Sequence, residues 1–183
     1  RKIYEHLGGK SPLLYLTRSQ ANALQENLSE MDEIKVFISM RYWHPMSKEV
    51  VRSVKDFAPD QIVLLPLYPQ YSGTTSGSSL RDWKEAAKKV GLSVPTLAIC
   101  CYPTDPGWIE AQAKLISKAL KSVTQGNEGR VLFSAHGLPK KVIAAGDPYQ
   151  WQVEKTVEAV VDQIGENQLD WAICYQSRVG PLE

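Results

Sequence analysis

The sequence lacks the features that mark most secreted, membrane-spanning and nucleic-acid-binding proteins. No apolar run approaches the roughly 18 residues of a membrane span. No signal peptide is recognisable, although the chain begins with Arg1 rather than Met. The 21 Lys and Arg residues nearly balance the 20 Asp and Glu residues without forming a polybasic run, so the charge indicates no nucleic-acid partner. What remains is a soluble globular protein.

Cysteine is scarce as well. The 183 residues include three cysteines, an odd number with no Cys-x-x-Cys spacing, so a disulfide framework is not indicated. Cys100, Cys101 and Cys174 lie in apolar runs and are interpreted as reduced, buried core residues of a cytoplasmic protein. Because neighbouring strand residues point to opposite faces, adjacent Cys100 and Cys101 are not expected to share a metal ion.

Short apolar runs alternate with longer segments of helical pattern. Most of the runs are continuous, as in strands that helices cover on both faces. Strands are expected at residues 34–40, 62–67, 95–100, 131–133 and 171–174. Helices are expected at residues 13–28, 47–57, 79–90, 106–120 and 149–164. An Asp-Pro pair serves as the N-cap device at the start of each of the last two. The alternation predicts an α/β fold with a mainly parallel sheet.

In such sheets, ligands bind beyond the carboxyl ends of the strands. The expected strand ends supply an arginine, several tyrosines, a tryptophan, two histidines and many hydroxyl groups. These groups suit a flat aromatic ligand with acidic substituents. A rival interpretation is that the Ser72–Ser79 run holds a phosphate, although no known phosphate-loop spacing is present.

Among the histidines, His136 is the strongest candidate for chemistry. An apolar strand delivers it to the rim, and Gly137 allows a ligand to approach closely. His44, between Trp43 and Pro45, fits a loop-fixing hydrogen bonder better than a ligand, and His6 fits a surface residue.

Several of these strand-end motifs resemble the ferrochelatase family, whose members insert ferrous iron into a porphyrin to make haem. Phe133–Pro139 is similar to the family's histidine motif. Five more segments match in the family's order and spacing: Gly8–Pro12, Met40–Pro45, Leu67–Ser72, Thr74–Ser79 and Tyr175–Pro181. The resemblance covers essentially the whole chain.

The resemblance implies two similar Rossmann-like lobes with the porphyrin cleft between them. Residues 1–103 would form most of the first lobe without its first strand, and residues 104–183 the start of a truncated second lobe. The family's glutamate across the cleft from the histidine would lie outside this chain, since Glu183 does not match it. The chain alone is therefore expected to be inactive.

The resemblance also assigns roles to individual residues. His136 would be catalytic, as a ligand of the ferrous substrate or as the base that accepts pyrrole protons. Arg41 and Tyr42 would lie opposite His136 and guide the metal or fix the ring. The other porphyrin-binding residues would be Tyr4, Ser11, Tyr68 and Ser177. Iron is a substrate, so no permanent cofactor is implied, and Gly73 replaces a cluster-binding cysteine of some members, so this segment supports no iron–sulfur cluster.

The predicted function is therefore that of a ferrochelatase, a lyase with a porphyrin and ferrous iron as partners. The alternatives are a cobalt chelatase of corrinoid synthesis, which shares the fold, and a non-catalytic tetrapyrrole-binding protein. Peripheral association with a membrane and the oligomeric state are left open.

Overall fold

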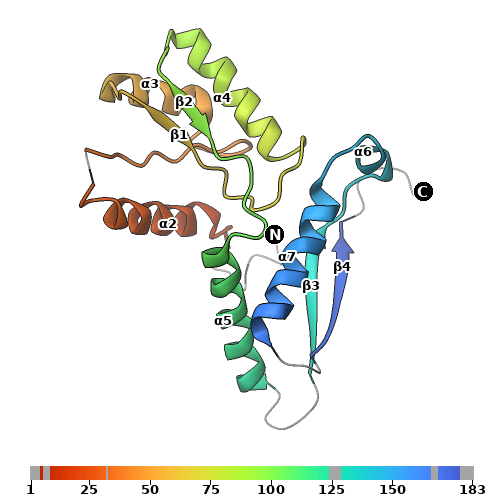
Figure 1. Ribbon diagram of the computed structural model, residues 1–183. Helices are drawn as coiled ribbons and strands as arrows, with labels where there is room; N and C mark the ends of the chain where they lie inside the picture. The colour runs from red at the N-terminus through yellow and green to blue at the C-terminus, as the bar shows by residue number, and fades with distance from the viewer. Residues whose placement is uncertain (1–4, 6–8, 32, 124–128, 166–168, 178–183) are drawn as a thin grey trace. The chain divides into compact units, whose positions relative to one another are not determined.

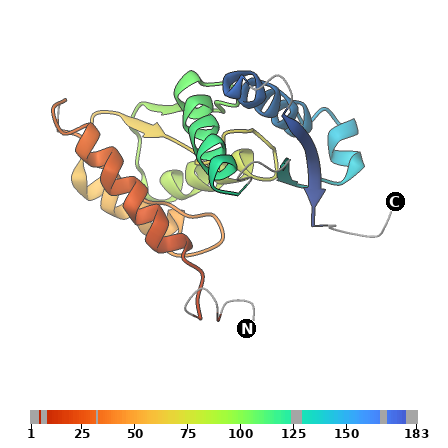
Figure 2. The same ribbon diagram turned by 90° about the horizontal axis from the view of Figure 1, so that it is seen from below.

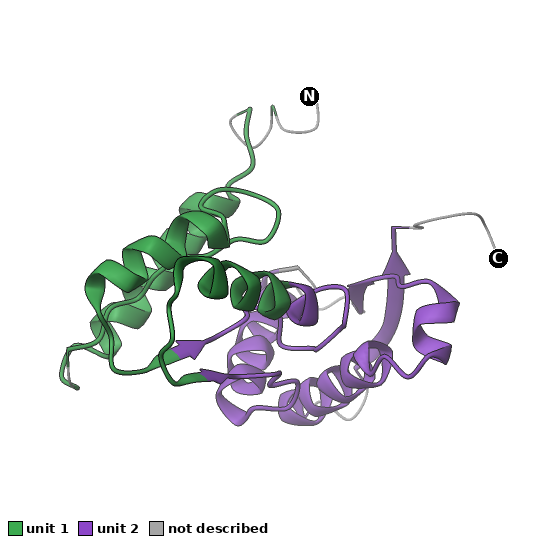
Figure 3. Cartoon of the chain, turned by 90° about the horizontal axis from the view of Figure 1, so that it is seen from above, with its two compact units in different colours: residues 1–62, 79–96 green, residues 63–78, 97–183 purple. Residues whose placement is uncertain are grey.

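The computed structural model describes residues 5, 9–31, 33–123, 129–165 and 169–177 (Figure 1). The chain divides into two compact units (Figure 3). The first unit comprises Arg1–Ile62 and Ser79–Thr96, and the second unit Val63–Ser78 and Leu97–Glu183. The two lobes expected at residues 1–103 and 104–183 stay a prediction.

Three helices build the first unit: α2 (Leu13–Asn27), α3 (Ser47–Phe57) and most of α4 (Ser76–Val90). The helices expected at 13–28 and 47–57 are confirmed, and α4 begins three residues before the expected position. The apolar stripe of α3 is buried together with two residues of α4, and the members of this core are Val50, Val51, Val54, Trp83 and Ala86. At the start of α3, Glu49 accepts a hydrogen bond from the Met46 backbone N–H at 2.9 Å, which with His44 lowers the pKa of Glu49.

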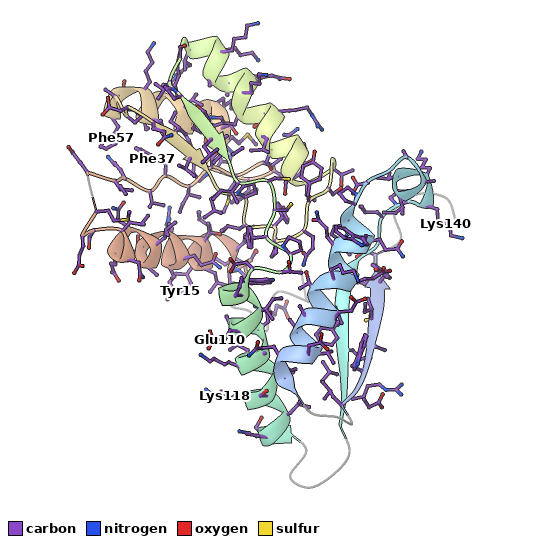
Figure 4. All side chains as sticks on the ribbon, in the orientation of Figure 1. Tyr15, Phe37, Phe57, Glu110, Lys118 and Lys140 are labelled. Atoms are coloured by element: carbon purple, nitrogen blue, oxygen red, sulfur yellow. The ribbon has the colours of Figure 1, made fainter. Side chains whose placement is uncertain are left out.

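The strand expected at residues 34–40 is wrong. The segment has no strand partner among the described residues, apart from an isolated bridge between Met40 and Met46. Instead, the side chain of Gln25 donates to the Ile34 carbonyl at 2.6 Å and accepts from the Val36 N–H at 2.7 Å. A side chain thus satisfies backbone groups that a neighbouring strand would otherwise bind. The Phe37 ring lies edge-on to Phe57, with centroids 5.9 Å apart (Figure 4).

The strands expected at 62–67 and 95–100 are present but short, as β1 (Ile62–Leu64) and β2 (Thr96–Ala98). They pair with each other. Ile62 N–H donates to Pro95 O and Ile99 N–H to Leu64 O, each at 2.9 Å, so the two strands run in the same direction. Proline lacks the N–H that a ladder requires, and Pro66 is the second residue after β1, which limits the pairing.

The second unit is built on the parallel pair β3 (Arg130–His136) and β4 (Asp170–Gln176), in register from Arg130 opposite Asp170 to His136 opposite Gln176. Its helices are α5 (Pro106–Val123), α6 (Lys140–Ala144) and α7 (Tyr149–Ile164). Helix α7 lies between α5 and the β3–β4 pair (Figures 1 and 2). The buried apolar residues of α5 and α7 are Ile109, Ala113, Val153, Val157 and Val160.

The parallel strands and flanking helices confirm the expected α/β class. Helix α7 has the expected bounds, α6 was not expected, and β3 and β4 are longer than their apolar runs. Asp105 caps α5 as expected, its Oδ1 accepting from the Trp108 N–H at 2.9 Å. No helix of the described residues is long and apolar enough to cross a bilayer.

The expectation that the cysteines are buried is wrong. Cys100 and Cys174 are exposed, and Cys101 is half-buried. The strand β2 ends at Ala98, before the cysteine pair begins. The alternation of a regular strand therefore does not apply to Cys100 and Cys101, and their sulfur atoms lie only 3.3 Å apart.

Candidate active site at the carboxyl ends of β3 and β4

His136 is the last residue of β3 and is exposed. Its Nδ1 lies 2.9 Å from the carbonyl oxygen of Gly137. A carbonyl oxygen can only accept a hydrogen bond, so Nδ1 carries the proton in this arrangement. In the neutral ring, Nε2 is then unprotonated, which is the form that binds a metal ion or accepts a proton.

Gly137 lets the chain beyond β3 run close to the end of β4. Its N–H donates to the Gln176 carbonyl at 2.7 Å. A Cβ atom at this position would lie 3.2 Å from the same oxygen and 3.5 Å from the Ser177 carbonyl, so a side chain would crowd both. The close approach brings His136 and Ser177 to the same edge of the sheet. Ser177 has a φ of 64°, which is unusual for a residue other than glycine.

Two tyrosines lie near this edge. Burial raises the pKa of Tyr149, against the opposing effect of a backbone hydrogen bond from His136. Burial, followed by the negative charge of Glu154 and by Tyr149, raises the pKa of Tyr175. Both phenols therefore keep their protons at neutral pH and can serve as hydrogen-bond donors.

A cavity of about 250 Å³ lies between β3 and α7. It is lined by Gln70, Phe133, Ser134, Ala135, His136, Tyr149, Val153, Thr156 and Val157. Ligand pockets usually measure ~300–1,000 Å³, so this cavity alone would not enclose a large flat ligand. A larger hollow of about 430 Å³ on the side of α5, near Glu110 and Lys118 (Figure 4), contains none of the predicted site residues.

Asp147 joins the start of α7 to the loop that follows β1. Its Oδ2 accepts hydrogen bonds from the Ser72 hydroxyl at 2.9 Å and from the Gly73 N–H at 2.8 Å. Its Oδ1 accepts from the Tyr149 N–H at 3.1 Å. The N-cap position of α7 falls on Pro148, one residue later than predicted, but the Asp147 side chain still binds the N–H of the first helical residue. The other oxygen of Asp147 binds residues about 75 positions earlier in the chain.

This contact bears on the phosphate-binding interpretation of the Ser72–Ser79 run. Ser72 and Ser76 are 0% exposed. The Ser72 hydroxyl and the Gly73 N–H already donate hydrogen bonds to the Asp147 carboxylate. These are two of the groups that a phosphate bound by this run would use. The run thus holds an anion of its own chain, which disfavours the phosphate hypothesis.

Two buried polar residues of α7 bind the same loop. Gln152 Oε1 accepts from the Tyr71 N–H at 2.6 Å. The Thr156 hydroxyl accepts from Gln70 Nε2 at 2.8 Å and donates to the Pro103 carbonyl at 2.7 Å. These bonds fix the segments that follow β1 and β2 to the helix that also packs on β3.

The other predicted site residues belong to both units. In the first unit, the Arg41 guanidinium lies 4.8 Å from the centre of the Tyr42 ring and 3.8 Å from Asp82. Ser11 is exposed and its hydroxyl accepts from the Leu13 N–H at 3.3 Å, at the start of α2. Tyr68, in the second unit, is 47% exposed. Tyr4 lies outside the described residues.

His44 is a loop-fixing hydrogen bonder, as expected, since its Nδ1 lies 3.0 Å from Glu49 Oε1. Sequence reasoning missed Tyr149, Gln152 and Thr156. The signal for the last two was available, because they are polar residues four positions apart beside the apolar stripe of α7. Within the described part of the chain, no group of three or more His, Cys, Asp and Glu side chains could hold a metal ion.

In α/β folds with parallel strands, ligands bind beyond the carboxyl ends of the strands, which is where His136 lies. The ferrochelatase family model matches residues 1–183. The chain belongs to the ferrochelatase family.

Individual relatives agree with this assignment. The chain is 48% identical to the ferrochelatase of Pelagibacter ubique (strain HTCC1062) over 186 residues, which cover 100% of this chain and 53% of the relative. It is 51% identical to that of Wolbachia sp. subsp. Drosophila simulans (strain wRi) over 185 residues, which are 100% of this chain and 59% of the relative. For Caulobacter vibrioides (strain NA1000 / CB15N), the identity is 52% over 183 residues, 98% of this chain and 52% of the relative. The chain thus spans between half and 60% of the length of these curated relatives.

The contacts of Asp147 predict a large effect of Asp147→Ala on stability. The substitution leaves the buried Ser72 hydroxyl and the Gly73 N–H without their charged acceptor. We expect a loss of about 3 kcal/mol in the free energy of unfolding, measured by urea denaturation of the full protein. Asp162→Ala, at an exposed position of the same helix, is the matched control. Equal effects of the two substitutions would contradict the bridging role of Asp147.

Proposed function

We propose that the protein to which this chain belongs is a ferrochelatase, a protohaem ferro-lyase that inserts Fe²⁺ into protoporphyrin IX or a closely related porphyrin to form haem. The observation that carries the proposal is the state of His136. Its Nδ1–H donates to the Gly137 carbonyl, so in the neutral ring the lone pair is on Nε2. The ring stands at the end of β3. The identity of about half of all residues to curated ferrochelatases supports the same activity.

Metal insertion requires loss of water from the cation, removal of two pyrrole protons and exposure of ring nitrogens that a flat macrocycle hides. The free Nε2 of His136 suits the first two tasks, since neutral imidazole binds ferrous iron well and is a base near neutral pH. We assign His136 one of these two roles, delivery of the metal or acceptance of the protons, which use the same lone pair. Distortion of the ring would come from close contacts with other residues.

The proposed porphyrin-binding residues are Tyr4, Ser11, Arg41, Tyr42, Tyr68 and Ser177. Hydroxyl groups of Tyr4, Ser11 and Ser177 would donate to the ring's propionates. The stacked pair of Arg41 and Tyr42 would fix the ring or guide the metal. Support for Arg41 comes from its ion pair with Asp82 and its contact with the Tyr42 ring, which together restrict the guanidinium.

Ferrous iron is a substrate in this proposal, and no permanent cofactor is required. Gly73 stands where some members of the family carry a cluster-binding cysteine, and its N–H is bound to Asp147. We propose that this segment binds no iron–sulfur cluster and that the protein acts in the cytoplasm. That the chain alone is inactive stays a prediction.

The first functional prediction concerns His136→Ala in the full-length protein. Porphyrin binding should persist, whereas metalloporphyrin formation with Fe²⁺ or Zn²⁺ should fall by about 10²-fold or more, because the ligand or base is lost. Absorbance of the product and quenching of porphyrin fluorescence measure the two properties separately. His44→Ala is the matched control and should retain most of the activity, since that imidazole binds Glu49.

Near-normal turnover by His136→Ala would remove this residue from the mechanism. A wild-type protein that binds haem and releases it without any metal insertion would instead be a tetrapyrrole carrier. Faster insertion of Co²⁺ into a corrinoid precursor than of Fe²⁺ into protoporphyrin would identify a cobalt chelatase.

A second prediction concerns Ser177→Ala. The substitution keeps Cβ, and with it the backbone strain at φ 64°, but removes the hydroxyl. Binding of porphyrins with free propionates should weaken by ~0.5–1.5 kcal/mol, as expected for one hydrogen bond. Titration with esterified porphyrins is the control, and an equal loss with the esters would show that Ser177 does not bind the propionates.

A further inference from the structure

Cys100 and Cys101, which follow β2, have their sulfur atoms in contact. Cys100 is exposed and Cys101 is half-buried. The Cys101 thiol donates to Cys100 Sγ at 3.3 Å. Cys174, the remaining cysteine, is exposed on β4. The chain therefore contains a thiol pair and, for comparison, a single thiol.

The two sulfur atoms are in non-bonded contact at 3.3 Å. A disulfide has an S–S length of about 2.05 Å, so the two sulfur atoms need to approach by roughly 1.2 Å. Adjacent Cα atoms are only about 3.8 Å apart, below the usual disulfide range of about 4.4–6.8 Å. A bond between them would therefore be strained and easily reduced, as reversible disulfides are.

The pair is also connected to the loop of the candidate site. Gln152 Nε2 donates to Cys101 Sγ at 3.5 Å. The other end of the same amide, Oε1, accepts from the Tyr71 N–H at 2.6 Å. Gln152 is 7% exposed, so it has little access to water as a replacement partner. Movement of Cys101 Sγ toward Cys100 would withdraw one of the two bonds that orient this amide.

We propose that Cys100 and Cys101 form a reversible redox site, which closes to a disulfide by exchange with a small disulfide such as oxidised glutathione and thereby loosens the hold of Gln152 on Tyr71. The Cys100 thiolate attacks one sulfur of the oxidant, forms a mixed disulfide and releases one glutathione thiolate. The Cys101 thiolate then attacks the Cys100 sulfur and releases the second. Two protein thiols lose two protons and two electrons, and one glutathione disulfide is reduced to two thiols. The thiol exchange itself does not require the proposed metal insertion.

Although the residue is exposed, partial desolvation of its sulfur, together with the neighbouring Cys101, raises the pKa of the Cys100 thiol. Because the thiolate is the attacking species, exchange at neutral pH is slow and requires an excess of the oxidant. The second step is favoured by proximity, since the Cys101 sulfur already lies against its target.

Mass spectrometry of the full protein tests the proposal directly. The protein is incubated with oxidised glutathione, denatured, alkylated and digested with trypsin. Cleavage after Lys89 and Lys114 places both cysteines of the pair in Val90–Lys114, and cleavage after Lys155 and Arg178 places Cys174 in Thr156–Arg178. We expect Val90–Lys114 to contain an internal disulfide with neither glutathione nor alkyl groups, and dithiothreitol to restore two alkylatable thiols.

Single substitutions supply the matched controls. Cys100→Ser and Cys101→Ser should each convert the internal disulfide into a stable mixed disulfide with glutathione on the remaining thiol. Cys174→Ser should leave closure of the pair unchanged. Recovery of wild-type Val90–Lys114 with two alkylated thiols, with two glutathione groups or as a cross-link between chains contradicts the proposal.

Amide hydrogen exchange tests the connection to the loop. The Tyr71 amide should exchange several-fold faster in the oxidised protein than in the reduced protein. The difference should be absent in Cys101→Ser under the same oxidant. An unchanged Tyr71 exchange rate in a protein whose disulfide has formed would overturn the coupling through Gln152.

Discussion

The hydrogen bonds that buried polar side chains of α7 make to the strand-end loops are the constraint on which the second unit depends. Each loop after β1 and β2 carries backbone groups that no strand pairs, and leaving one buried donor unsatisfied costs about 1–3 kcal/mol. Gln152 and Thr156 bind the Tyr71 N–H and the Pro103 carbonyl. Gln152 and Thr156 are buried next to Val153 and Val157 in the sequence of α7. The buried side of the helix therefore contributes both apolar packing and hydrogen bonds to the loops. Burial of two polar residues in a helix core is thereby compensated.

Asp147 extends the same principle to the beginning of α7. A carboxylate that receives a hydroxyl and an N–H from the loop makes charge-assisted bonds, which are about twice as strong as neutral ones. The loop that resembles a phosphate cradle thus folds around an internal anion. The Ser72 hydroxyl thus holds the loop against α7. Tyr68, nearer the strand end, is exposed and accessible to a ligand.

Local signals in the sequence predicted local structure well. Asp105-Pro106 identified the start of α5, and the apolar spacing identified α7 to its terminal residues. Contacts between residues far apart in the sequence could not be predicted from such local signals. The Ile34–Met40 run has the composition of a strand, but the Gln25 side chain binds its backbone. For the same reason Asp147 was interpreted only through its neighbour Pro148, since its partners are about 75 residues away. At the candidate site, a strand-end histidine could be predicted, whereas its tautomer depends on a carbonyl whose direction only the fold determines.

The Gly137 carbonyl connects the pairing of β3 and β4 to the orientation of the His136 ring. Gln176, at the end of β4, accepts the Gly137 N–H at 2.7 Å and so fixes the peptide that follows His136. The Gly137 carbonyl, held in this segment, binds Nδ1 of His136. An exposed imidazole would otherwise rotate freely, but here its orientation follows from the backbone rather than from burial. The ring can therefore remain open to a ligand and still present a defined nitrogen. Glycine suits position 137 because a Cβ would approach the Gln176 carbonyl to 3.2 Å, a tight contact that the neighbouring backbone would have to relieve by a small shift.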